Sequence, residues 1–91
     1  MVYIVVYAAH VLEDDLVKLD REISLRMQDA AQTKLETQPE IFGKPLRHSL
    51  RNHKALRVGD YRIVYRIDGN IVRVIAMVHR KDVYRVAGMR V

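Results

Sequence analysis

Hydrophobic positions in the first half of the chain follow one strand pattern and two helical patterns. Residues 2–7 form an apolar, β-branched run, which predicts a strand. Helical spacing then predicts a short helix from Val11, Leu12, Leu16 and Leu19. After Asp20, which is suited to cap a helix, a second stripe contains Ile23, Met27, Ala30, Ala31, Lys34 and Leu35. Because the residue before proline disfavours helical backbone, residues 37–39 end this helix, and the two helices are expected to form an αα-hairpin.

From about His53 the hydrophobic period changes to two, and Gly59-Asp60 and Gly69-Asn70 mark tight turns. This pattern predicts three antiparallel strands in a β-meander. The expected pairs are Arg57–Arg62, Leu56–Ile63, Ala55–Val64 and His53–Arg66 at the first turn, then Arg66–Arg73, Val64–Ile75 and Arg62–Met77 at the second. The predicted fold class is therefore α+β, with an N-terminal strand, a two-helix hairpin and a β-meander, and with the helices packed on one sheet face.

Alternation along these strands separates two faces of the predicted sheet. The apolar face, which the helix pair is expected to cover, holds Leu56, Val58, Tyr61, Ile63, Tyr65, Ile67, Val72, Val74, Ala76 and Val78. The other face is expected to be open and basic, with an apolar floor formed by Ala55, Val64, Ile71, Ile75 and Met77. Its charged and titratable side chains are His53, Arg57, Arg62, Arg66, Arg73 and His79.

Composition adds a charge asymmetry to this picture. The 91 residues predict a single domain, 1–91, with a formal charge of +5. Residues 1–42 carry four basic and eight acidic side chains, whereas residues 43–91 carry twelve and three. Such a basic second half predicts a polyanionic partner, either nucleic acid or an acidic protein. The absence of cysteine excludes a disulfide scaffold and a thiolate zinc site, and no metal-ligand spacing, signal peptide or membrane helix stands out, so a cytoplasmic protein is expected.

Arginines on a sheet face suit phosphate, because each guanidinium is always charged and presents a planar fork of donors. Like charges directly opposite across a sheet are destabilising, so Arg57–Arg62 and Arg66–Arg73 predict an anion between the strands. The candidate RNA-binding side chains are Lys54, Arg57, Arg66, Arg73 and Lys81. Lys54 falls by parity on the apolar face next to Tyr65, which favours an edge lysine with its amine in solvent.

Cleavage of a phosphodiester needs a base, charge stabilisation at the phosphate and an acid. Arg62 or Arg80 could stabilise the charge. The base and the acid could come from His53, His79, Lys54 or Tyr84, and the residues leave this choice open. Tyr84 could instead stack on a base of single-stranded RNA.

Several segments in order along the chain resemble the RelE/ParE superfamily of bacterial type II toxin–antitoxin toxins, on the RelE side. The strongest are Leu56–Tyr65 and His79–Tyr84, and weaker matches lie at residues 3–7, 15–19, 22–23 and 39–47. The resemblance implies a small sheet with two N-terminal helices against one face. It also implies cleavage of mRNA in the ribosomal A site without metal or cofactor, and neutralisation by a cognate antitoxin.

The same resemblance assigns individual residues. Arg62 matches the family's phosphate-stabilising arginine, Arg80 its arginine after the last strand, and Tyr84 its base-stacking or acid–base tyrosine. One departure is clear: RelE enzymes carry lysines on the strand that begins this meander, at positions that align with His53 and Ala55. Alanine carries neither charge nor proton, so His53 or Lys54 would have to act in place of those lysines.

Three functions therefore remain as hypotheses. The first is a ribosome-dependent mRNA endoribonuclease that inhibits translation. The second is a ParE-like inhibitor of DNA gyrase, and the third is a catalytically weak member that binds RNA or its antitoxin. In each case an acidic antitoxin segment is expected over the basic face and the sheet edge, with operator DNA bound only through the antitoxin.

Overall fold

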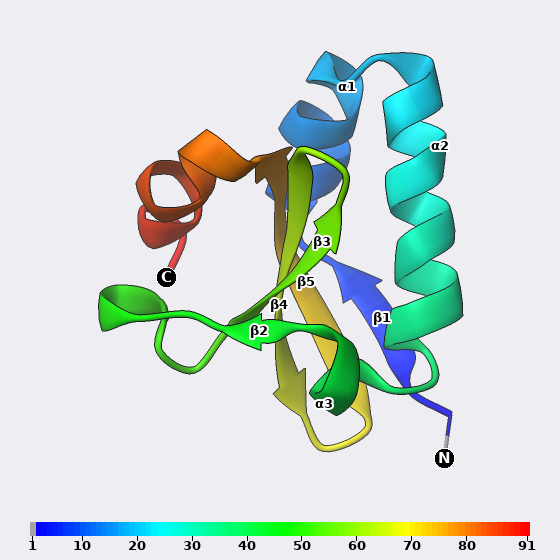
Figure 1. Cartoon of the computed structure of the whole chain (residues 1–91), viewed down its shortest axis with the longest axis vertical. Coiled ribbons are helices and arrows are strands. Elements are labelled where there is room, and N and C mark those ends of the chain that lie inside the picture. The colour runs from blue at the N-terminus through cyan, green and yellow to red at the C-terminus, as the bar shows by residue number, and fades with distance from the viewer. Residues whose placement is uncertain (1) are drawn as a thin grey trace.

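A five-stranded sheet forms the centre of the molecule, as seen in a computed structural model that describes residues 2–91. The strands lie in the order β1-β5-β4-β3-β2 (Figure 1). β1 pairs with β5 in parallel, and the other neighbours are antiparallel. In chain order the strands are β1 (Ile4–Tyr7), β2 (Lys44–Pro45), β3 (Lys54–Val58), β4 (Tyr61–Asp68) and β5 (Ile71–His79).

The predicted helical hairpin is confirmed and covers one face of the sheet (Figure 1). Asp20 occupies the N-cap position of the second helix, where its carbonyl oxygen accepts the Ser24 N–H at 2.8 Å. A short helix that begins at Pro39 follows the hairpin and leads into β2. The helical elements up to this point are η1 (Val11–Asp15), α1 (Leu16–Lys18), α2 (Arg21–Ala30), η2 (Ala31–Leu35) and α3 (Pro39–Phe42), where η denotes a short π or 3₁₀ segment.

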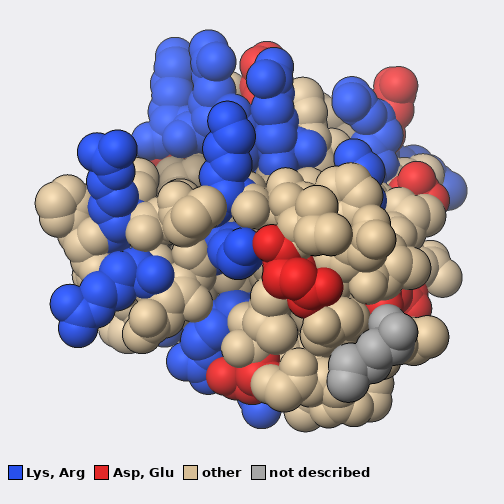
Figure 2. All heavy atoms as spheres, turned by 60° about the horizontal axis from the view of Figure 1, so that its bottom comes forward, with Lys and Arg blue, Asp and Glu red and all other residues tan. Residues whose placement is uncertain are grey.

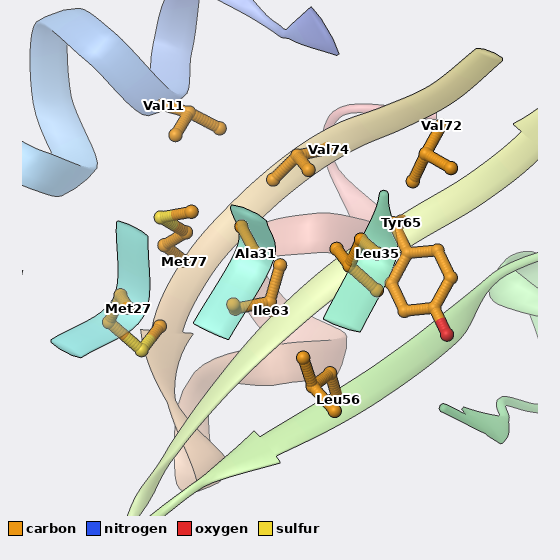
Figure 3. Packing of buried hydrophobic residues seen from close by; sticks show 10 residues of the cluster. All are labelled: Val11, Met27, Ala31, Leu35, Leu56, Ile63, Tyr65, Val72, Val74 and Met77. Carbon is orange, nitrogen blue, oxygen red and sulfur yellow. The ribbon is translucent and has the colours of Figure 1, made fainter. Parts of the chain in front are cut away.

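The main core lies between the hairpin and the sheet (Figure 3). Tyr65 is fully buried in it, and its phenol donates a hydrogen bond to the Pro39 carbonyl. Burial raises the pKa of Tyr65 to about 12. A Cβ at Gly43 would overlap the Tyr65 phenol oxygen, so only glycine lets the chain pass this close on its way into β2. The buried residues of this core are Val11, Met27, Ala31, Leu35, Leu56, Ile63, Tyr65, Val72, Val74 and Met77.

The expected register is confirmed at the first turn for the three pairs within β3, whereas His53 precedes β3 and its expected pair with Arg66 lies outside the ladder; at the second turn the register is partly wrong. Arg57 pairs with Arg62, and Gly59 in the turn has a φ of +60°. Across the second turn Arg66 pairs with Arg73 as expected. Beyond them, a bulge between Val64 and Tyr65 shifts the pairing, so the expected Val64–Ile75 and Arg62–Met77 pairs are wrong. The pairs observed there are Val64–Ala76, Ile63–Met77, Arg62–Val78 and Tyr61–His79.

This bulge exchanges the two faces at the end of β5, because one extra residue reverses side-chain alternation. Met77, expected on the basic face, enters the main core. Ala76 and Val78, expected beneath the hairpin, lie on the opposite face. Tyr61 and His79 pair directly, so His79 lies on the hairpin face and the prediction that it shares a face with Arg62 is wrong.

An ion pair between the buried Asp15 and the largely buried Arg90 holds the backbone at this bulge. Arg90 donates from Nη1 to Asp15 Oδ2 at 2.8 Å and from Nη2 to Oδ1 at 2.9 Å. Arg90 Nη1 also donates to the Ile75 carbonyl at 2.8 Å, while the Met77 N–H donates to Asp15 Oδ2 at 2.8 Å. The pair thus satisfies backbone groups on both sides of the bulge and joins the hairpin to the C-terminal end of the chain.

The second sheet face is not open, contrary to the prediction. Beyond β5 the chain forms η4 (Arg80–Asp82) and η5 (Val83–Ala87), and η5 packs against this face together with η3 (His48–Leu50) (Figure 1). Val64 and Ala76 are completely buried beneath them. The buried residues of this smaller cluster are Leu50, Val64, Ala76, Val83 and Ala87. None of the helices within residues 2–91 is long and apolar enough to cross a membrane.

Candidate nucleic-acid interface

The C-terminal cover, which is η5 (Val83–Ala87) packed over Val64 and Ala76, divides the predicted basic face into two separate ends. Val64 lies between Arg62 and Arg66 on β4, and it is buried under η5. One group of arginines therefore lies near the β4–β5 turn and the other near the β3–β4 turn. Lys and Arg side chains gather along the upper and left margins of the view in Figure 2, whereas Asp and Glu atoms lie mostly toward its centre and right.

At the β4–β5 turn the protein supplies its own anion. Asp68 Oδ2 accepts from Arg66 Nε at 3.1 Å and Nη2 at 2.8 Å, and from Arg73 Nε at 3.0 Å. The hydrogen bond from Arg66 is the main cause that lowers the pKa of Asp68, and Arg73 adds to it. The repulsion predicted between these paired arginines is therefore relieved within the sheet, and an external phosphate is not needed here.

At the β3–β4 turn the carboxylate of Asp60 is present but forms no salt bridge within residues 2–91. Arg57, Arg62, Arg80 and Lys81 form no salt bridge with any other side chain in residues 2–91. Arg80 belongs to this end because its N–H donates to the Asp60 carbonyl in the turn at 2.9 Å. Of the two groups, this one keeps its positive charge available to a polyanion.

Arg62 is held in place without losing its phosphate-binding donors. Its Nη1 donates to the Gly59 carbonyl at 3.1 Å and to the Tyr61 carbonyl at 2.9 Å. The remaining Nε–H and Nη2 hydrogens have no acceptor within residues 2–91. A guanidinium anchored in this way presents a fixed fork of donors, which suits bidentate binding of a phosphate.

Tyr84 lies at the edge of the C-terminal cover, beside a loop that the sequence did not single out. Its phenol oxygen accepts the Arg47 N–H at 3.1 Å, which leaves the phenol hydrogen free to donate. The ring is 47% exposed, so it remains accessible to a stacking base. Tyr84 lines a shallow hollow of about 390 Å³ with Arg47 and His48, which has a φ of +57°. That positive φ depends on the folded loop and leaves no pattern in the sequence.

His79 has a structural role on the hairpin side of the sheet. Its Nδ1 accepts the Lys81 N–H at 3.2 Å and caps η4, so the neutral ring carries its proton on Nε2. The ring also meets Tyr61 edge-on, with a centroid distance of 5.4 Å. These contacts orient the segment that carries Arg80 and Lys81.

Lys54 and His53, the two side chains that could replace the lysines of RelE enzymes, lie away from Arg62. Lys54 pairs with Tyr65, as its parity predicted, and its amine donates to the Glu40 carbonyl at 2.8 Å. His53 is only 6% exposed, and its Nδ1 has no hydrogen-bond partner within residues 2–91. Burial is the main cause that lowers the pKa of His53; the Arg66 guanidinium adds to it and Asp68 opposes it. Neither side chain is preassembled beside Arg62 as a general base.

The depressed pKa of His53 predicts a pH dependence of stability. The unfolded imidazole takes up a proton below about pH 6.5, whereas the folded one stays neutral to lower pH. The free energy of unfolding should therefore fall as the pH drops from that value toward the folded pKa. Urea denaturation of the wild type and His53→Gln between about pH 7.5 and about pH 5.5 tests this. Parallel pH profiles for the two proteins would contradict it.

The residues that the structure describes, 2–91, contain no group of three or more His, Asp or Glu side chains placed to hold a metal ion. The candidate interface consists of arginines, a lysine and a tyrosine around the β3–β4 turn and the C-terminal cover. These groups can bind and polarise a phosphodiester and stack on a base.

This combination of fold and basic surface is similar to that of small toxins of the RelE/ParE superfamily, as comparison with known proteins shows. Residues 6–84 match a family model described as the ParE toxin of the type II toxin–antitoxin system parDE. The chain is 38% identical over 73 residues to toxin RelG of Mycobacterium tuberculosis, across 78% of this chain and 84% of that protein. It is 36% identical over 73 residues to toxin RelE of the same organism, across 78% and 75% of the two chains.

Solved structures show the same fold. A chain in the toxin–antitoxin complex RelBE2 from Mycobacterium tuberculosis superposes with a TM-score of 0.80 and 33% identity, across 88% of this chain and all of the other. A mutant of Escherichia coli toxin RelE in the free state superposes with a TM-score of 0.78 and 21% identity, across 100% of this chain and 99% of the other. The chain therefore belongs to the RelE/ParE superfamily of type II toxin–antitoxin toxins.

Proposed function

We propose that this toxin is an mRNA endoribonuclease that acts in the ribosomal A site and inhibits translation until an antitoxin neutralises it. The observation that carries the proposal is the group formed by Arg57, Arg62 and Arg80, which no carboxylate within residues 2–91 neutralises. It lies within the two segments that most resemble RelE enzymes, and the chain is 38% identical to a toxin named RelG.

In the proposed reaction the 2′-OH attacks the adjacent phosphate and leaves a 2′,3′-cyclic phosphate and a 5′-OH. The free N–H groups of Arg62, with Arg80 nearby, stabilise the charge that develops on the phosphate. Tyr84 either donates its phenol hydrogen to the leaving oxygen or stacks on a base. Because neither His53, His79 nor Lys54 lies free beside Arg62, the 2′-OH proton passes to water or to a ribosomal group that also positions the hydroxyl, and naked mRNA should be cleaved poorly.

Primer extension on mRNA after induction of the toxin without its antitoxin tests this proposal. Cuts inside translated codons are expected, and they should disappear when translation is blocked. Purified toxin added to the same mRNA without ribosomes is the matched control and should leave it largely intact. Growth arrest with uncut mRNA would contradict the proposal.

A second candidate is inhibition of DNA gyrase without chemistry of its own. Two observations favour it: the matched family model is named for ParE, and Ala55 cannot replace a catalytic lysine. This function predicts a DNA-damage response with intact mRNA. A member that only binds RNA or antitoxin would instead cause little growth arrest when expressed alone.

The antitoxin partner follows from the family, and its position on this chain is part of the proposal. An acidic segment is expected to contact the arginines at the β3–β4 turn, because those at the other turn already bind Asp68. Its association rate should fall as salt is raised. Operator DNA is expected to bind only through the antitoxin.

A further inference from the structure

The helix hairpin, which is acidic overall, contributes one arginine to the β3–β4 turn. Arg26 projects from α2, and its Nη2 lies 3.5 Å from the position that a Cβ at Gly59 would occupy. Arg62 reaches the same glycine from the strand side, through its hydrogen bond to the Gly59 carbonyl at 3.1 Å. The two guanidinium groups therefore flank Gly59, although they come from different halves of the chain.

Arg26 also lines a hollow of about 280 Å³ between α2 and the turn. The hollow is bordered by Ile23, Arg26, Arg57, Val58, Gly59, Asp60 and Tyr61. Although Asp60 is among these residues, neither arginine forms a salt bridge with it or with any other acid in residues 2–91. Two unneutralised arginines thus border one concave site of a size suited to a phosphate with part of its sugar.

We propose that Arg26 forms, with Arg57, a second phosphate subsite for single-stranded RNA that continues from Arg62 around the β3–β4 turn. This inference rests on the proposed function. RNA carries a negative charge at every nucleotide, so a strand that places one phosphate at Arg62 needs a cation for the next phosphate. Arg26 meets this requirement because it lies against the residue that also anchors Arg62. Single-stranded RNA fits this row of cations better than an acidic peptide, whose charges need not follow each other so regularly.

Binding of a fluorescein-labelled RNA of about ten nucleotides tests the subsite. The RNA carries 2′-O-methyl groups, which prevent cleavage, and fluorescence anisotropy is recorded at several salt concentrations. Arg26→Gln is expected to weaken binding roughly fivefold and to reduce the slope of log K against log salt by about 0.7, the effect of losing one phosphate contact. Arg26→Lys should restore most of the slope, because counterion release depends on charge.

Arg21→Gln is the matched control, since Arg21 is exposed on the same helix and does not border the hollow. It should bind RNA as the wild type does, and equal melting temperatures would show that each variant folds. If Arg57→Gln and Arg62→Gln lower the slope but Arg26→Gln does not, the subsite is wrong and the proposed function stands. If Arg26→Gln lost as much affinity for a poly-glutamate peptide as for RNA, that result would also overturn the subsite. No RNA binding by the wild type would also overturn the subsite, whereas the proposed function is tested separately by the translation-dependent cuts in primer extension.

Discussion

Replacing Asp15 by alanine is expected to lower the free energy of unfolding by about 3–5 kcal/mol, the usual cost of breaking a buried ion pair from one side. The substitution leaves the Arg90 guanidinium largely buried without its carboxylate, and it also removes the acceptor of the Met77 N–H. Since domains of this size are stable by only about 5–15 kcal/mol, a large part of the fold's stability depends on this one side chain. Urea denaturation followed by circular dichroism measures the effect.

Asp14→Ala provides the control, because Asp14 is the adjacent acid but is exposed, and within residues 2–91 its salt bridge is to His10, at 3.5 Å. Its free energy of unfolding should stay within about 0.5 kcal/mol of the wild type. A double-mutant cycle of Asp15→Ala with Arg90→Met should show strong coupling between the two positions. If Asp15→Ala unfolds at the same urea concentration as Asp14→Ala, the buried pair does not stabilise the bulge as described.

Arg62→Ala is expected to reduce the rate of mRNA cleavage by about 100- to 1,000-fold, the usual effect of removing a donor that stabilises developing charge. The toxin should then no longer arrest growth when it is induced without an antitoxin. Single-turnover cleavage on programmed ribosomes measures the rate. Arg62→Lys should recover only part of it, because an ammonium keeps the charge but lacks the planar fork.

Two controls separate catalysis from folding in this experiment. Arg21→Ala removes one positive charge from an exposed helix position and should leave the cleavage rate unchanged. Equal melting temperatures of Arg62→Ala and the wild type would show that the bonds from Arg62 to the Gly59 and Tyr61 carbonyls are not essential to the fold. Full growth arrest by a folded Arg62→Ala protein would remove Arg62 from the proposed mechanism.

The division of the arginines into two groups changes the interpretation of the interface. From sequence, Arg66 and Arg73 were as good candidates for RNA binding as Arg57 and Arg62, because each pair lies directly opposite across the sheet. Asp68 neutralises Arg66 and Arg73 through three hydrogen bonds. The phosphate site proposed here is therefore restricted to the β3–β4 turn and its neighbours.

The sequence by itself determined the parts of this protein that depend on local patterns. Helical spacing and Asp20 located the hairpin, and Gly59-Asp60 fixed the register of β3 and β4, because a two-residue loop allows only one pairing. Parity correctly placed Lys54 beside Tyr65. The Leu56–Tyr65 and His79–Tyr84 segments also identified the family, which the comparisons confirm.

Only the tertiary structure decided which side chains share a face at the end of β5. A bulge adds one residue without changing the hydrophobic pattern, and the ion pair that holds it joins Asp15 to Arg90 across 75 positions of sequence. The cover over Val64 and Ala76 likewise depends on η5 folding back over the sheet. Local patterns cannot predict such contacts, because distant segments come together only when their burial and hydrogen bonds are satisfied at the same time.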